Sequence, residues 1–141
     1  MQPFERISDA AGRVLALVIR AEYSVDRTSF FSEADYSQQV GIIKYPKGGV
    51  IKPHYHNEVL RQVVYTQEVL IIRKGSVSVD LFDASLAWVE RVELRTGDTI
   101  FLIAGGHGFT MQDDAEMLEV KQGPYSGVSN DKTQFVAGKG A

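Results

Sequence analysis

Apolar and polar residues alternate in short runs along most of the chain, and glycine or charged turns separate the runs. A period of two places every second side chain on the same face, which is typical of β-strands with one buried face. The pattern predicts strands at residues 14–23, 40–45, 69–73, 76–81, 86–94, 99–103 and 117–121. Helical periodicity is nearly absent, so the sequence predicts an all-β sandwich or barrel.

The chain has 141 residues, which is the usual size of one compact domain. We expect residues 40–122, where most of the predicted strands lie, to form the body of the fold. Residues 1–39 should add N-terminal strands that pack on this body or on a dimer partner. Residues 123–141 are rich in glycine, serine, asparagine and lysine. They should form a C-terminal extension that is flexible from residue 136 onward.

Charge and composition exclude several classes of function. The formal net charge is -3, which gives no basic field for nucleic acid or for an anionic membrane. The absence of cysteine excludes disulfides, thiolate metal sites and cysteine nucleophiles. No apolar run approaches membrane-spanning length, and the apolar run at residues 14–19 is too short for a secretion signal. We therefore expect a cytoplasmic protein with a small-molecule partner.

The three histidines are the main candidates for chemistry. His54 and His56 lie two residues apart, so on an extended strand both imidazoles share one face. His107 follows the predicted strand 99–103 within a glycine-rich stretch. Each histidine alone is readily explained by a hydrogen-bonded structural role, but two neighbouring imidazoles repel when protonated, and a shared cation removes this repulsion. Three imidazoles and one carboxylate make a complete ligand set for a divalent metal.

Two stretches resemble the motifs of the cupin superfamily. Gly49 precedes the His-x-His pair, and Glu68 then leads to Gly75, as in the first cupin motif, while residues 97–107, ending in His107, are similar to the second. The resemblance covers about residues 40 to 122 and implies a single-domain cupin-type double-stranded β-helix, a jelly-roll barrel. It also implies one divalent metal ion, for which zinc, manganese, iron, nickel and cobalt are all suitable. The implied ligands are His54, His56, Glu68 and His107.

The choice of carboxylate ligand lies between two glutamates. In the usual first motif the glutamate follows the second histidine closely, whereas Glu68 comes twelve residues after His56. Glu58 is nearer to the pair, but it lies in an apparent lengthening of the hairpin at residues 58–65. Glu68 opens an apolar strand and shares a face with Leu70, so an inward-facing carboxylate there is desolvated and fixed by the backbone. We therefore expect Glu68 to be the ligand.

A cupin fold with a metal does not fix the function. We expect an enzyme of small-molecule metabolism, in which the cation polarises a carbonyl or holds an enediolate during isomerase, epimerase or lyase chemistry. An iron-loaded form would act as a dioxygenase. Similarity to small cupins linked with sugar and polysaccharide metabolism implies a carbohydrate-like ligand. Two alternatives stay open: a non-catalytic module that binds metal and a small ligand, and a metal-free sugar epimerase-like cupin with His54 or His107 as general base and a tyrosine as acid.

The early apolar segment suggests an oligomer. Residues 15–19 are apolar on both faces of the predicted strand, so something must cover both of them. A second subunit is one cover and the protein's own barrel is the other. We expect a homodimer in which residues 14–23 or the neighbouring strand contribute to the interface.

Overall fold

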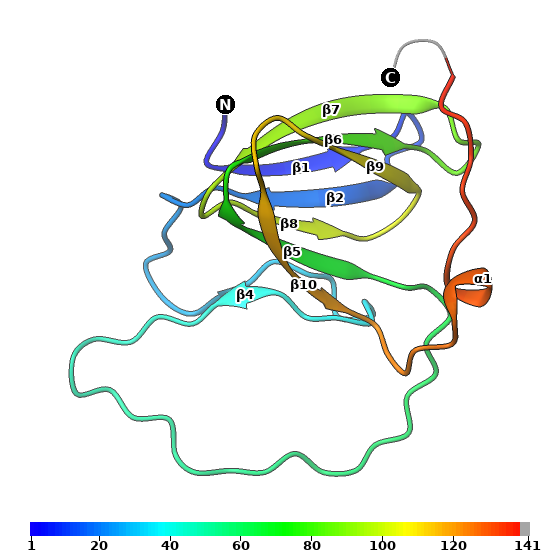
Figure 1. Ribbon diagram of the computed structural model, residues 1–141. Helices are drawn as coiled ribbons and strands as arrows, with labels where there is room; N and C mark the ends of the chain where they lie inside the picture. Colours follow the sequence, from blue (N-terminus) through cyan, green and yellow to red (C-terminus); the bar gives the residue numbers. More distant parts are fainter. Residues whose placement is uncertain (139–141) are drawn as a thin grey trace.

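The computed structural model describes residues 1–138, and these fold almost entirely as antiparallel strands (Figure 1). The prediction of an all-β protein is confirmed. The only helix in the part described is α1, a single turn at Val128–Asp131. The strands are β1 Phe4–Ser8, β2 Val14–Ile19, β3 Ser29–Phe30, β4 Gly41–Ile42, β5 Glu68–Lys74, β6 Ser76–Phe82, β7 Trp88–Arg95, β8 Thr99–Leu102, β9 Gly106–Met111 and β10 Glu116–Lys121.

Two sheets pack face to face and enclose the main core. One has the strand order β1-β2-β8-β5-β10 and the other β7-β6-β9, while β3 and β4 form a small separate pair. Alternate residues of the facing strands point between the two sheets, as the period-two pattern requires. Buried core residues from both sheets include Val18, Leu70, Ile72, Val77, Val79, Leu81, Val92, Leu94, Ile100 and Leu102.

The outer face of the five-stranded sheet is also partly covered. Leu17 of β2 and Phe101 of β8 are fully buried there, with Ile103 beside them. The covering residues come mainly from the stretch between β2 and β4 and include Phe31, Tyr36 and Val40. The central strands of this sheet are therefore apolar on both faces, which explains why their sequence runs are almost continuously hydrophobic.

The sheets do not close into the barrel that the sequence led us to expect. β9 is the last strand of one sheet and β10 the last strand of the other, so each has an open edge. The strand predicted at residues 40–45 is reduced to Gly41–Ile42, and residues 43–66 form no strand at all. A strand needs a neighbour for its backbone hydrogen bonds, and after Ile42 the chain leaves its only neighbour, β3. We call residues 43–66 the connecting segment.

The early apolar strand is covered within the chain itself. β2 lies between β1 and β8, and its residues 15–19 are buried. The strand ends at Ile19, short of the predicted residue 23, because Arg20 turns into a buried ionic cluster. The exposed apolar surface on which the expected β2 interface depended is thus absent, and the homodimer stays a prediction.

The buried ionic cluster joins three parts of the chain. The guanidinium of Arg20 donates hydrogen bonds to Glu5 Oε1 (Nη2 to oxygen, 2.6 Å) and to Asp98 Oδ2 (Nη1 to oxygen, 3.0 Å). Arg20 and Asp98 are each about 95% buried. Asp98 also accepts hydrogen bonds from the backbone N–H groups of Ala21 and Arg95. This cluster ties the end of β2 to the turn before β8.

The C-terminal extension contacts the three-stranded sheet. Residues 139–141, part of the predicted flexible tail, lie outside the described residues. Phe135 packs its ring against Phe82, with ring centroids 5.0 Å apart, so the extension returns to the sheets before its end. Across residues 1–138, no helix combines the length and the apolar character needed to cross a membrane.

Candidate functional site

Glu68 and His107 meet between the two sheets. Glu68 is the first residue of β5 in the five-stranded sheet, and His107 is the second residue of β9 in the three-stranded sheet. The distance between His107 Nε2 and Glu68 Oε2 is 3.0 Å, and the side chains are 31% and 16% exposed. The pair therefore joins two motifs that are far apart in the sequence. Both side chains are partly buried and remain accessible to solvent.

The strand registers explain why both side chains point inward. Glu68 lies opposite Leu102 of β8, and His107 lies opposite Leu81 of β6. Residues directly opposite each other in antiparallel strands share a face of the sheet. Leu102 and Leu81 both belong to the core between the sheets. Glu68 and His107 therefore face the same interior and lie at the edge of this core.

A glycine turn sets the position of His107. Gly105 has φ of 73°, a left-handed backbone angle that favours glycine. A Cβ atom at Gly105 would also collide with the backbone carbonyl oxygen of Phe82. No larger residue fits at this position, so the turn from β8 into β9 is fixed and His107 follows it directly.

Glu119 adds a second carboxyl group to the site. It lies on β10 opposite Leu70 and forms a side-chain hydrogen bond with Glu68. The hydrogen bond from His107 holds the pKa of Glu68 below its usual value, while partial burial and the neighbouring Glu68 raise the pKa of Glu119. Of the two carboxyl groups, Glu68 therefore ionises first and Glu119 keeps its proton to higher pH.

Lys121 completes the polar cluster. Lys121 lies opposite Glu68 in the register of β10 and β5. Its ammonium donates a hydrogen bond to Asp131 Oδ2 (3.1 Å), which raises the pKa of Lys121. Sequence reasoning predicted the strand at 117–121 but overlooked Glu119. The available signal was the recurrence of charged residues at 119 and 121, two apart on one face of that strand.

The structure does not bring His54 and His56 to this cluster. Both lie in the connecting segment, where every residue is exposed and no strand forms. Their rings are neighbours, with centroids 5.4 Å apart, and His54 Nδ1 lies 2.8 Å from the backbone oxygen of Lys52. The segment runs as a wide loop away from the sheets, blue-green in Figure 1. Glu58, the rival carboxylate, lies in the same loop.

The Glu68–His107 separation is that of a direct hydrogen bond, and it is also compatible with two ligands of one metal ion. Metal–nitrogen and metal–oxygen bonds of about 2.0–2.2 Å, at angles between octahedral and tetrahedral, place neighbouring ligand atoms about 3.0–3.4 Å apart. The observed separation of 3.0 Å falls in this range. Among residues 1–138, no group of three or more histidine, aspartate or glutamate side chains is arranged to hold a metal. Of the four residues predicted as ligands, the structure brings Glu68 and His107 together and leaves His54 and His56 apart from them.

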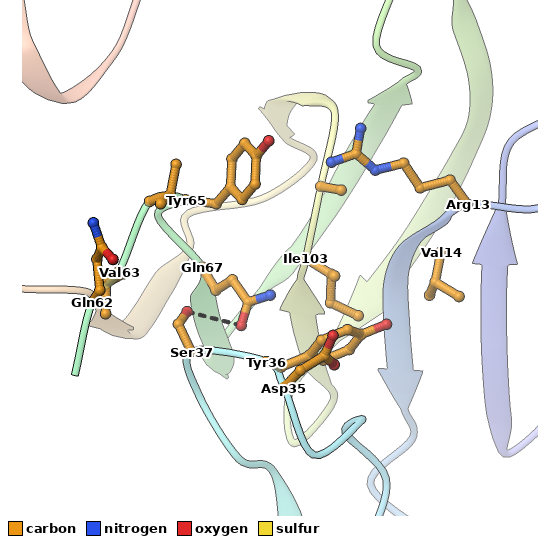
Figure 2. Close-up of a pocket in the computed structure, with 12 residues that line it drawn as sticks. Arg13, Val14, Asp35, Tyr36, Ser37, Gln62, Val63, Tyr65, Gln67 and Ile103 are labelled. Atoms are coloured by element: carbon orange, nitrogen blue, oxygen red, sulfur yellow. Dashed lines mark hydrogen bonds between the residues drawn. The ribbon is translucent and has the colours of Figure 1, made fainter. Parts of the chain in front are cut away.

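A separate pocket lies on the other side of the five-stranded sheet (Figure 2). Its volume is about 450 Å³, and Ser37 Oγ donates a hydrogen bond to Gln67 Oε1 (3.1 Å) at its wall. None of the four predicted metal ligands lines it. The lining combines residues of the connecting segment with Arg13, Val14, Asp35, Tyr36, Ser37, Gln67, Ile103 and Ala104.

The fold and the site together define an antiparallel, two-sheet β protein with a histidine–carboxylate cluster at the margin of its core. No family model, no curated protein and no solved structure matches the chain. A functional assignment therefore depends on the chemistry of the cluster itself.

Proposed function

We propose that the protein is a metal-binding cupin that acts on a small polar metabolite. The observation that carries this proposal is the close approach of Glu68 and His107, one from each cupin-like motif, at a separation suited to a shared cation. His54 and His56 are the remaining proposed ligands. They can join the pair only if the connecting segment of this chain or of a second copy approaches the two sheets, and every residue of that segment is exposed.

The surrounding residues suit a polar substrate. When bound, a divalent cation would polarise a carbonyl or stabilise an enediolate in an isomerase, epimerase or lyase reaction. Glu119 has a raised pKa and lies beside the anionic Glu68, so it is suited to holding a proton for transfer. Lys121 supplies positive charge close to the same carboxyl groups. A hydroxylated, carbohydrate-like molecule matches this arrangement of donors and acceptors.

A metal-free acid–base enzyme is the second candidate. It is favoured by the direct contact of His107 Nε2 with Glu68 Oε2, because a carboxylate partner orients an imidazole and supports its action as a base. Glu119, rather than the tyrosine expected from the sequence, would then be the acid. In this reading the exposed histidines of the connecting segment have no catalytic role.

Metal titration separates the two candidates. We expect the full-length protein, purified without an affinity tag and stripped with chelator, to bind one Mn²⁺ or Zn²⁺ per chain in calorimetric titration. Glu68→Gln and His107→Ala should each weaken binding by at least about tenfold. Glu58→Gln is the matched control and should leave the affinity unchanged.

The opposite results are equally informative. Absence of metal binding, together with conversion of a metabolite in a screen without added metal, would overturn the metal proposal in favour of acid–base catalysis. Equal losses in the Glu58→Gln and Glu68→Gln variants would move the carboxylate ligand into the connecting segment.

A further inference from the structure

The connecting segment carries an unusual load of exposed apolar surface. Every residue from 43 to 66 is exposed, and half of the exposed large apolar side chains among the described residues lie in this one stretch. Leu60 is fully exposed, and Val50 and Val64 are more than 70% exposed. A concentration of this kind marks a surface that a partner covers, because burying it removes apolar area from water.

Each of the two sheets has an edge strand whose outer backbone groups pair with no other strand within residues 1–138. β9 and β10 are each an edge strand, and the short stretch 112–115 joins them. Both strands leave this stretch with one edge unpaired, β9 in the sheet that carries His107 and β10 in the sheet that carries Glu119. Unpaired edge strands recruit an additional extended chain, since its backbone completes their hydrogen bonds.

The charges of the two regions are complementary. The connecting segment contains four lysine or arginine residues and one glutamate. Residues 106–121, which form β9, β10 and the turn between them, contain four aspartate or glutamate residues and one lysine. Opposite charge favours the approach of the segment to these edges and disfavours the association of two copies edge to edge.

Contacts at both ends of the segment hold it away from its own edge strands. Beyond β4, Lys44 Nζ donates a hydrogen bond to the backbone oxygen of Val25. Before β5, the Arg13 guanidinium lies 5.9 Å from the centroid of the Tyr65 ring, and Gln67 is buried against the stretch at residues 37–38. Between these points the segment leads outward (Figure 1), which makes it available to another molecule.

We infer that the connecting segment of one copy pairs with the β9 and β10 edges of a second copy, and that the exchange is reciprocal. A reciprocal exchange closes on itself with two-fold symmetry and leaves neither edge exposed. It brings His54 and His56 of one chain to Glu68 and His107 of the other, so each metal centre is built from two chains. This last consequence rests on the proposed function, whereas the exchange itself does not.

Sedimentation velocity of the full-length chain tests the exchange. At micromolar concentration we expect the mass of a dimer. The variant Val59→Ser/Leu60→Ser should raise the dimer dissociation constant by at least about tenfold, because it removes apolar contact area from the interface. Both residues are exposed in the single chain, so the fold should survive, as circular dichroism would verify. Val136→Ser, at a site that is 97% exposed elsewhere, is the control and should leave the dimer intact. A monomeric wild-type protein, or a dimer that the double serine variant does not weaken, would overturn the inference.

Mixing complementary variants tests the shared site. His54→Ala/His56→Ala and Glu68→Gln/His107→Ala should each fail to bind Zn²⁺ in equilibrium dialysis. Refolded together, they should form mixed dimers with one intact site each. Zn²⁺ binding should therefore return to about one ion per mixed dimer. Binding that stays absent in mixtures, although the wild-type protein binds Zn²⁺, would show that all ligands come from one chain. Absence of Zn²⁺ binding by the wild-type protein would refute the metal proposal alone, and sedimentation would still decide the exchange.

Discussion

The sheet body and the connecting segment contain similar residues in very different surroundings. Leu15 and Leu17 of β2 are fully buried, whereas Leu60 in the segment is fully exposed. Both regions are rich in valine, isoleucine and aromatic residues, which favour strands only when a neighbouring strand and a covered face are present. The comparison shows that local sequence determines whether a stretch can form a strand. The presence of a neighbouring strand then decides whether the strand forms.

Polar groups differ between the two regions in the same way. Within residues 1–138, every buried side-chain nitrogen or oxygen has a hydrogen-bond partner. Arg20 and Asp98 illustrate this in the body, since each is fixed by several bonds from different strands. In the segment, His54 contacts a backbone oxygen two residues away and the ring of His56. The buried polar side chains of the body are therefore bonded within the chain, whereas the side chains of the segment are open to solvent.

The largest effect should follow from opening the buried core. Phe101→Ala should lower the free energy of unfolding by about 3–5 kcal/mol, because Phe101 is fully buried on the outer face of the sheet and its loss leaves a cavity. Urea denaturation followed by circular dichroism measures this. A loss below about 1 kcal/mol would mean that this face is loosely packed.

A somewhat smaller loss is expected from the buried ionic cluster. Asp98→Asn removes the anionic partner of the buried Arg20 and should cost about 3 kcal/mol in the same measurement. Glu33→Gln is the control: Glu33 forms an exposed ion pair with Arg6 at 3.6 Å, and such pairs contribute less than about 1 kcal/mol. Equal losses in the two variants would contradict the burial of the cluster.

Acid should weaken the body through Asp80. The guanidinium of Arg91 and the indole N–H of Trp88 donate hydrogen bonds to its carboxylate, and the bond from Arg91 is the main reason that the pKa of Asp80 is lowered. A lowered pKa means that the contribution is present above the ordinary value of about 3.9 and is lost as the pH falls through the lower folded value. Asp80→Asn should therefore cost about 1 kcal/mol at pH 7 and less at pH 2. Urea midpoints at both pH values test this, and a pH-independent difference would refute it.

The smallest effect should come from the segment. Leu60→Ala should change the free energy of unfolding by less than about 0.5 kcal/mol when measured on the monomer at high dilution. Comparison with Phe101→Ala shows how far the cost of removing a large apolar side chain depends on its burial. A loss comparable with that of a core substitution would show that Leu60 packs within its own chain.

Sequence reasoning located the paired strands well. The predictions at 69–73, 76–81, 86–94, 99–103 and 117–121 each fall within two residues of the observed strands β5, β6, β7, β8 and β10. β6 and β7 alternate because the core covers one face of each, whereas β5 and β8 are apolar on both faces and stand out as hydrophobic runs. β1 and β9 were overlooked, since β1 mixes polar residues into its run and β9 begins among glycines.

The candidate site was predictable only in part. The order of the two cupin-like motifs predicted that Glu68 and His107 belong to one site, and the structure places them in contact. Spacing alone placed His54 and His56 on one face of a strand, but it carries no information about whether that strand finds a neighbour. Glu119 was overlooked because a charged residue in a strand ordinarily faces solvent. Glu119 is indeed exposed, and only the register with β5 shows that it lies on the same face as Leu70 and Glu68.

The pairing of β2 with β8 has a consequence for proteolysis. Four residues of β2, from Ala16 to Ile19, pair with β8, so the part of the chain before the connecting segment is built into the sheet formed by the part after it. Trypsin cleavage at exposed Lys47 or Arg61 would cut the covalent link without touching that sheet. The two fragments would stay together as a nicked protein with an intact core. Expressed separately, the same two fragments would form a split protein whose reassembly reports on their encounter.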